Sequence, residues 1–271
     1  MHDGTPTPSP ANRKSSFITF STTRCAACGR CVEDCVGGVL AMRGGRPQVI
    51  EERSAFCVRC GHCVSVCPEN AITLDGRNSS ELRHVTDFCM GEAGLSLLRE
   101  RRAIRRYSGS VVNEELLREA IYYAGHAPTA HNYRQVEYIV INGRNKVEAL
   151  LQRAIRHMEK HDICMSHVEN VRQGRDTLFR GAPCIILLHA PERILSETDC
   201  AIASAYLELA LHCLGLGSCW VGILLESFMY GILEGLNIPA GRKLYGAVLV
   251  GTPQSLYERV PFRSMPRVEW R

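Results

Sequence analysis

The sequence has no apolar run long enough to cross a membrane, since none reaches the roughly 18–20 residues that a bilayer-spanning helix needs. Its first twenty residues also lack the apolar core of a secretory signal peptide. They are rich in proline, threonine and serine, which indicates a flexible tail. These absences predict a cytoplasmic protein with no membrane partner.

Strong charge of either sign is missing as well. The 271 residues carry a net charge of +4, and much of the excess base lies in one stretch of arginines at residues 99–106. A balance this weak does not indicate a nucleic-acid-binding surface, so no nucleic acid is expected as a partner. No G-x-G-x-x-G fingerprint for a dinucleotide occurs either.

Cysteine, in contrast, is abundant, with 14 residues. Disulfide frameworks are typical of small secreted chains, so metal or redox use is the better interpretation here. Eight cysteines form two copies of C-x2-C-x2-C-x3-C, 32 residues apart: Cys25, Cys28, Cys31 and Cys35, then Cys57, Cys60, Cys63 and Cys67. The other six lack ligand spacing, and most are expected to be buried small hydrophobes: Cys89, Cys164, Cys184, Cys200, Cys213 and Cys219.

The spacing within each copy suits a cubane iron–sulfur cluster. Three cysteines at x2 spacing wrap one cluster, and the fourth, three residues later, reaches the neighbouring cluster. One 4Fe–4S cluster is therefore predicted to take Cys25, Cys28, Cys31 and Cys67, and the other Cys57, Cys60, Cys63 and Cys35. The segment over residues 20–75 resembles bacterial two-cluster ferredoxins, except that Val36 replaces the usual proline.

Two structural zinc sites are the alternative, because they also use paired C-x2-C motifs. Zinc needs only four ligands and usually separates its pairs by a dozen or more residues. Three cysteines at consecutive x2 spacing fit that pattern poorly, so the sequence favours clusters.

Beyond residue 78 the pattern changes to alternating helices and strands. Helices are predicted near 91–100, over 114–125 with Asn113 as the cap, and over 145–161, 199–217 and 227–237. Strands are predicted over 137–144, 181–190 and 243–253. The helix over 199–217 is apolar almost all round, which predicts a central buried helix.

Several motifs then occur in the order of one family. RRAIRRY at residues 101–107 resembles the RRSIRxF motif that opens the nitroreductase-like flavoproteins. Further resemblances follow in APTAHN (127–132), GAP (181–183), LGLGSCW (214–220), LVGTP (249–253) and RVPFR (259–263). The whole chain thus looks like a ferredoxin–nitroreductase fusion of the α+β class. We expect a tail over 1–16, a two-cluster ferredoxin domain over 17–78, a helical connection over 79–98 and an FMN domain over 99–271.

The resemblance implies an FMN site built on the arginine run. Arg101 and Arg105 match phosphate or ribityl ligands, for which a planar guanidinium is well suited. Arg102 matches an arginine whose backbone lies along the flavin, and Ala103 replaces a serine, which leaves only its backbone contact. Taken alone, the run would instead indicate a solvated basic patch or a nucleic-acid contact.

The resemblance also implies flavin contacts outside the run. Thr129 lies in the APT loop, and Asn132 matches a contact with the flavin ring or ribityl chain across a dimer interface. Three residues that follow the helix predicted over 199–217 match backbone N–H donors to the flavin: Trp220, Val221 and Gly222. For Trp220, packing in the core is the alternative.

Other residues of the matched motifs have less definite roles. Arg259 and Arg263 match basic residues near the phosphate, one of which could simply face solvent. His126 and His131 could donate protons, although hydrogen-bonded loop histidines are the simpler interpretation. Arg134-Gln135-Val136 replaces Gln-Pro-Trp, which predicts a more polar lining. No protein side chain is expected to be catalytic, because the flavin carries the chemistry.

These features predict an FMN-dependent oxidoreductase that passes electrons from two 4Fe–4S clusters to FMN and reduces small organic acceptors such as nitroaromatics or activated alkenes. Ferredoxin or NAD(P)H is the expected donor, in an anaerobic setting, and a homodimer with FMN at its interface is expected around the helix over 199–217. The alternatives are a redox sensor or electron carrier without a dedicated substrate, and a zinc-stabilised nucleic-acid-binding protein.

Overall fold

The structure is a computed structural model that describes residues 17–82, 91–225, 236, 238–254, 257, 259–261 and 263–271. Cys89, the tail over 1–16 and, apart from residue 236, the helix predicted over 227–237 lie outside these residues. Two compact units are distinguished: Met1–Phe88 with His131–Tyr133, and Cys89–Ala130 with Arg134–Arg271. No helix in the described ranges has the length and apolar character needed to span a bilayer.

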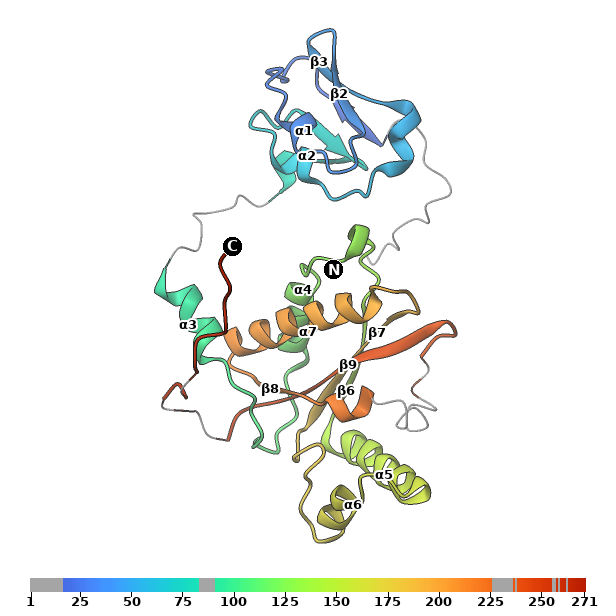
Figure 1. The fold of residues 1–271 in the computed structure, drawn as a ribbon, viewed down its shortest axis with the longest axis vertical. Helices are drawn as coiled ribbons and strands as arrows, with labels where there is room; N and C mark the ends of the chain where they lie inside the picture. The colour runs from blue at the N-terminus through green and yellow to red at the C-terminus, as the bar shows by residue number, and fades with distance from the viewer. Residues whose placement is uncertain are drawn as a thin grey trace. The chain divides into compact units, whose positions relative to one another are not determined.

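The first unit contains two small sheets and short helical turns (Figure 1). Its strands are β1 (Ile18–Phe20), β2 (Leu40–Arg43), β3 (Arg46–Val49), β4 (Ile72–Leu74) and β5 (Arg77–Asn78). Strand β4 lies between β1 and β5, and β2 and β3 form a hairpin, with all pairs antiparallel. Its helices are α1 (Arg30–Glu33) and α2 (His62–Ser65), with 3-10 turns η1 (Glu51–Phe56) and η2 (Ser79–Glu81).

The sequence repeat is also a structural repeat. Gly29 precedes α1 with φ 77°, and Gly61, 32 residues later, precedes α2 with φ 78°. Both are left-handed conformations that cost an L-residue with a Cβ about 1 kcal/mol or more. The glycine between the second and third cysteine of each copy therefore lets the chain turn from the loop into the helix.

The second unit is built on one four-stranded antiparallel sheet. Its strands are β6 (Glu137–Asn142), β7 (Cys184–Pro191), β8 (Gly217–Trp220) and β9 (Arg242–Gly251), in the spatial order β6-β7-β9-β8. Its helices are α3 (Glu92–Glu100), α4 (Glu114–Ala124), α5 (Arg144–His161), α6 (Met165–Arg172) and α7 (Ser196–Cys213), with the 3-10 turn η4 (Gly222–Leu225). The 3-10 turn η3 (Ala130–Asn132) begins in this unit at Ala130, and its other two residues are counted with the first unit. The helices and strands predicted for the described residues are present, but the helix predicted over 199–217 ends at Cys213, and Gly217 begins strand β8, which was not predicted. Asn113 caps α4 by accepting from the Glu115 N–H.

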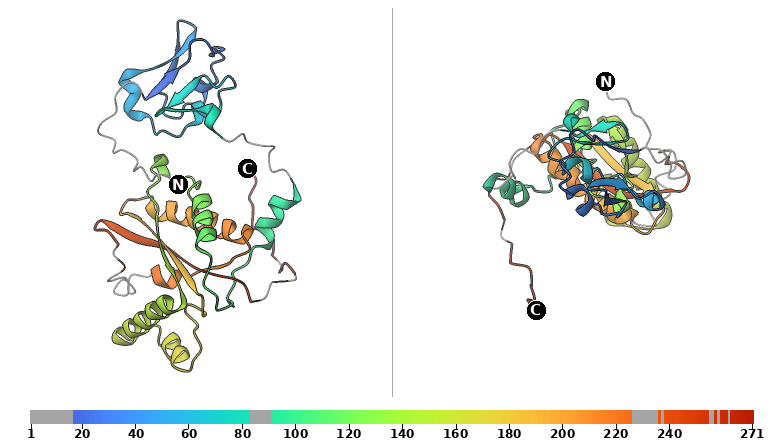
Figure 2. Two further views of the ribbon diagram at one scale, coloured as in Figure 1. Left: turned by 180° about the vertical axis from the view of Figure 1, so that it is seen from behind. Right: turned by 90° about the horizontal axis from the view of Figure 1, so that it is seen from above.

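Helices cover both faces of this sheet, which makes a three-layer sandwich (Figure 2). Ile185 and Leu187 of β7 pack on the side of α5, whereas Ile186 and Leu188 pack on the side of α4 and α7. Alternate residues of a strand point to opposite faces, so a strand covered on both sides must be apolar throughout. This explains the continuous apolar run of β7.

Helix α7 differs in one respect from the prediction that it is buried all round. One face, which includes Ala203, Leu207 and Leu211, is buried against the sheet and α4. The opposite face is exposed in the single chain, including Tyr206 and, two turns later, Cys213. The expectation that Cys213 is buried was therefore wrong, because α7 lies in an outer layer and only its inner face has a covering partner.

The arginine run is attached to the sheet edge by backbone bonds. The Ile104 N–H donates to the Ser218 carbonyl of β8 at 2.8 Å, and the Ser108 N–H donates to the Thr252 carbonyl at 2.9 Å. The Ile104 side chain is buried directly against Gly217, where a Cβ would lie 2.8 Å from it. The absence of a side chain at residue 217 thus allows the run to lie this close to β8.

Replacing Gly217 by alanine should therefore destabilise the second unit by about 1–3 kcal/mol, the usual effect of overpacking. Gly109→Ala is the matched control, because its Cβ would meet only the end of the flexible Arg144 side chain. Urea unfolding followed by circular dichroism measures both. Equal effects of the two substitutions would contradict the close packing of Ile104 on Gly217.

Candidate functional site

Four cysteines from both sequence repeats line one cavity of the first unit. Three come from the first repeat and the fourth from the second: Cys25, Cys28, Cys31 and Cys67. Pro47 and Ile72 form apolar parts of the wall, and the empty volume is about 340 Å³, part of it open to solvent.

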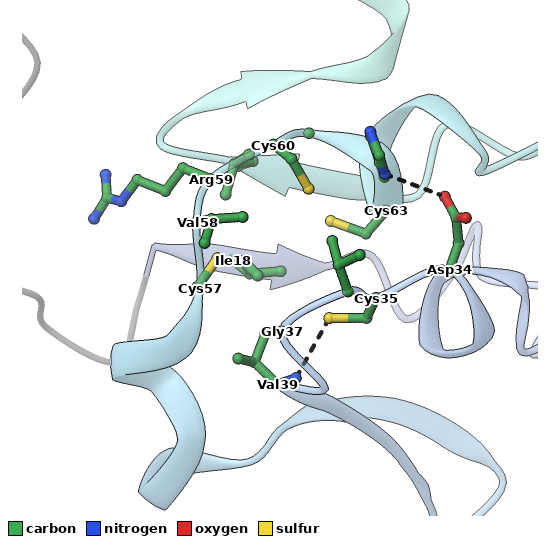
Figure 3. Close-up of a pocket in the computed structure, with 14 residues that line it drawn as sticks. Ile18, Asp34, Cys35, Gly37, Val39, Cys57, Val58, Arg59, Cys60 and Cys63 are labelled. Carbon is green, nitrogen blue, oxygen red and sulfur yellow. Dashed lines mark hydrogen bonds and ion pairs between the residues drawn. The ribbon is translucent and has the colours of Figure 1, made fainter. Parts of the chain in front are cut away.

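A second cavity of the same unit is lined in the complementary way, by Cys57, Cys60, Cys63 and Cys35 (Figure 3). Its empty volume is about 350 Å³, and Ile18 and Val39 contribute apolar surface. The structure therefore brings together the same two sets of four cysteines that the crossed assignment predicted.

Backbone N–H groups donate to the crossing cysteine of each repeat. The Val39 N–H donates to Cys35 Sγ at 3.3 Å, and the Ala71 N–H, 32 residues later, donates to Cys67 Sγ at 3.3 Å. Hydrogen bonds to cysteine sulfur stabilise its thiolate form and tune the potential of a bound cluster. The two crossing cysteines thus have equivalent surroundings.

Three of these thiols have raised pKa values: Cys31, Cys57 and Cys63. Burial, together with smaller contributions from the nearby Cys57, Cys60 and Cys35, raises the pKa of Cys63 to about 12. Burial likewise raises the pKa of Cys31, with a smaller contribution from Cys67. Because metal ligands must be thiolates, loading these cavities would release protons.

The linings can also be compared with what a cluster and a zinc ion each need. A cubane binds each of its four thiolates through a different iron, so its ligands surround a wider space than a single zinc does. Four cysteines around each cavity fit a cubane better than a zinc ion.

A second group of charged residues lies where the arginine run meets β8 and α7 of the second unit. Arg101 forms an ion pair of 3.3 Å with Glu208, which also accepts a 3.3 Å hydrogen bond from the Ser218 hydroxyl. Arg102 donates to the carbonyls of Arg101 and Arg99, but its Nε is buried without a partner among the described residues. A buried donor left unpaired fits a group that binds an anionic ligand.

Arg105 and Arg180 also lie near this group. Burial raises the pKa of the Cys219 thiol, whereas the positive charges of Arg105, Arg180 and Arg101 act to lower it. All three guanidinium charges therefore act on the same thiol, that of Cys219 in β8. Ala103 lies beside Ser218 in a parallel bridge and contributes its backbone there.

Sequence reasoning did not identify Arg180 or Glu208. Arg180 is held near the site by Asp176, whose carboxylate accepts from the N–H groups of Leu178, Phe179 and Gly181 at 3.0, 2.8 and 2.8 Å. The one available signal was the position of Arg180 directly before the Gly181-Ala182-Pro183 motif.

The predicted APT loop is shaped by local hydrogen bonds. Thr129 Oγ1 accepts from the Arg134 N–H at 3.0 Å, and Asp199 at the start of α7 accepts from the Ala130 N–H at 2.9 Å. Asn132 is half-buried with φ 53°. Both nearby histidines are exposed, and His126 makes an edge contact with Tyr122.

The structure agrees only in part with the predictions for residues 220–222. Trp220 is 52% exposed, so the alternative that it packs in the core was wrong. Its ring lies against Gly222, and the Val221 N–H donates to the Ala247 carbonyl at 2.8 Å, which removes one of the expected flavin donors.

The remaining site and cysteine predictions concern isolated positions. Arg259 and Arg263 are both exposed. Three cysteines outside the cavities are buried, as predicted: Cys184, Cys200 and Cys219. Burial raises the pKa of the Cys184 and Cys200 thiols to about 12. These two thiols therefore remain protonated and behave as small hydrophobes.

Comparison with known families divides the chain as its motifs do. Residues 24–72 match a family described as a 4Fe-4S dicluster domain, and residues 98–252 match the nitroreductase family. A protein of Methanothermobacter thermautotrophicus named as an NADH dehydrogenase/NAD(P)H nitroreductase is 28% identical over 165 residues, which is 59% of this chain and 76% of that protein.

Two crystal structures share the fold of the second unit. A nitroreductase with bound FMN from Bacteroides fragilis has a TM-score of 0.55 and 22% identity, and the match covers 66% of this chain and 100% of that one. A nitroreductase with bound FMN from Desulfitobacterium hafniense has a TM-score of 0.54 and 20% identity, with the same two coverages.

The Asp176 carboxylate should be necessary for the position of Arg180. Asp176→Asn keeps an oxygen for Leu178 and Phe179 but loses the acceptor for Gly181, whereas Asp176→Ala loses all three bonds. We expect stability to fall in that order, with the alanine variant lower by about 1–3 kcal/mol. Urea unfolding gives the order, and amide exchange at Gly181 should quicken in both variants. Equal stability of the two variants would contradict it.

Proposed function

The chain belongs to the nitroreductase family, with a 4Fe–4S ferredoxin domain before the family domain, and we propose that it is an FMN-dependent oxidoreductase supplied with electrons by two 4Fe–4S clusters. The observation that carries the proposal is the pair of four-cysteine cavities, each with its fourth cysteine from the other repeat. Such ligand sets are those of two-cluster ferredoxins.

The FMN site is proposed at the group formed by Arg101, Arg105 and Arg180. Three guanidinium groups whose charges all act on Cys219 would suit a phosphate, because each offers two parallel donors. Glu208 holds Arg101 in place and offsets part of the positive charge while no ligand is bound. Thr129, Asn132 and the N–H of Gly222 are the further contacts that the family resemblance assigns. When bound, the clusters supply one-electron transfer and the flavin couples it to two-electron chemistry.

The acceptor is proposed to be a small organic molecule such as a nitroaromatic or an activated alkene. Trp220, exposed beside Gly222, offers an apolar surface for a flat acceptor. Arg134 is exposed in the loop after Asn132 and adds a positive charge, which favours acceptors with a nitro or carbonyl oxygen.

A homodimer is proposed to complete the site. The exposed face of α7 carries the apolar part of Tyr206 and the small residues Ala201 and Ala205, which would suit close packing against a second copy. The family resemblance gives the same expectation for Asn132, as a contact made across the interface.

The direct test is the cofactor content of anaerobically purified chain. About eight irons, eight sulfides and one FMN per chain are expected. Steady-state reduction of a nitroaromatic panel should then saturate with acceptor concentration. Colourless protein that contains zinc would overturn the proposal, and reversible reduction without saturable turnover would leave only an electron carrier.

The crossed ligation can be tested with single and double cysteine variants, whose losses of iron should not simply add. Cys67→Ser and Cys25→Ser should each remove one cluster, leaving about four irons, and the double variant should still hold about four, because both residues line one cavity. Cys67→Ser combined with Cys57→Ser should lose nearly all iron. Iron analysis with electron paramagnetic resonance of the reduced protein measures this. Ligation within each repeat would reverse the two double-variant results.

The arginine assignment predicts the affinity for FMN. Arg101→Gln and Arg105→Gln should each weaken FMN binding about 10–100-fold, since a charged hydrogen bond contributes about 1.5–3 kcal/mol. Arg106→Gln, an exposed neighbour in the same run, should change it little. Quenching of FMN fluorescence gives the dissociation constants, with thermal unfolding as the check on folding. An equal loss in all three variants would point to general charge attraction.

A further inference from the structure

The two cysteine cavities differ in how exposed their cysteines are. In the cavity lined by Cys25, Cys28, Cys31 and Cys67, the Cys28 side chain is exposed to solvent. In the other, Cys57 and Cys63 are buried and no cysteine is fully exposed. An electron carrier in solution can therefore approach the first cavity more closely, at Cys28.

Four exposed arginines lie in or next to the segments that line the cavity with the exposed Cys28, and we call them the arginine rim: Arg24, Arg30, Arg43 and Arg46. Arg30 lines the cavity itself. An Arg46 guanidinium nitrogen donates to the Cys25 carbonyl at 3.3 Å, which places it beside Arg24 and the first cysteine. Arg43 lies directly opposite Arg46 in the β2–β3 hairpin.

The rim keeps its positive charge. None of its members forms an ion pair with a carboxylate in the part of the chain that the structure describes, although Glu33 and Glu69 lie on the same side of the unit, on α1 and at the cavity. Like charges directly opposite one another in a hairpin are destabilising, so the Arg43–Arg46 pair does not help the fold. An excess of positive charge near a solvent-exposed cysteine instead suits the recognition of an acidic partner.

The other cavity has arginines too, but the one in its lining is paired with a carboxylate. Arg59 forms an ion pair with Asp75, and Asp34 at the cavity lies 3.8 Å from His62. Arg53 donates to the Gly37 carbonyl and lies over the Phe56 ring. Within the described residues, an exposed cysteine and a lining arginine without a carboxylate partner therefore occur together at the first cavity only.

We propose that the arginine rim is the docking surface for a small acidic one-electron carrier protein, which delivers electrons to the site held by Cys25, Cys28, Cys31 and Cys67. The inference rests on the proposed function, because that site must hold a cluster. In each encounter the reduced carrier loses one electron, the site gains one, and no bond or proton is exchanged. Complementary charge raises the encounter rate without tight binding, which suits a carrier that must leave after one transfer.

A protein carrier fits the rim better than a nucleic acid does. The positive charge is centred on a solvent-exposed cysteine, where close approach matters for electron transfer but has no use for a polyanion without a redox group. A surface patch with only four arginines is also small, as are the interfaces of transient redox complexes, which bury less than about 1,200 Å².

The test is anaerobic stopped-flow reduction of the full-length holoprotein by photoreduced flavodoxin, an acidic protein, with cluster absorbance as the signal. We compare Arg24→Gln, Arg43→Gln and the double variant with Arg77→Gln, an exposed arginine on β5 that is not part of the rim. Each rim substitution should lower the second-order rate constant at low salt by about threefold or more, and the control should not. The differences should disappear near 0.5 M salt, where the Debye length is only about 4 Å.

Two further measurements separate the possible failures. Reduction by photoreduced 5-deazariboflavin, a neutral small molecule, should be equally fast in all variants, which shows that the clusters are intact. If the wild type holds no reducible cluster, the proposed function fails and the docking surface fails with it. If the clusters are reduced by deazariboflavin while flavodoxin reduces all variants at one salt-independent rate, the docking surface alone is overturned. Short duplex DNA that binds the wild type and is lost in the rim variants would also overturn it, as a general polyanion site.

Discussion

Each cysteine cavity of the first unit takes three side chains from one repeat and the fourth from the other. This crossing ties together two halves that share only a thin core, in which cysteines themselves are among the buried residues. If metal fills the cavities as proposed, ligation and folding become one process, because neither half can complete its ligand set alone. The glycines before α1 and α2 then serve the same end, since they aim the cysteines inward.

In the second unit, several hydrogen bonds likewise meet at one residue, Ser218. Its carbonyl fixes the backbone of Ile104, and its hydroxyl donates to Glu208, which in turn holds Arg101. One residue of β8 thereby sets both the path of the arginine run and the direction of a guanidinium group. The proposed flavin site is thus built on the sheet edge, and the loop that carries Arg180 is fixed separately through Asp176.

Much of this could be predicted where the cause lies close in the sequence. The cysteine spacing, the cap at Asn113 and the apolar run of β7 are local patterns with local reasons. The pairing of Arg101 with Glu208 joins residues 107 positions apart, and no short-range pattern reports it. The exposed face of α7 was missed for a related reason, because an apolar helix has the same sequence whether a sheet or a second copy covers it.

The repeat also records how far its halves have diverged. Gly37 corresponds to Glu69 at the 32-residue offset, and a Cβ at Gly37 would lie 2.6 Å from the Phe56 carbonyl oxygen. The chain that forms β2, β3 and η1 passes through that space, and the second half has no equivalent segment before β4. The two halves are therefore no longer interchangeable. If the sequence of the second half replaced that of the first, a glutamate would stand at residue 37, where only glycine fits.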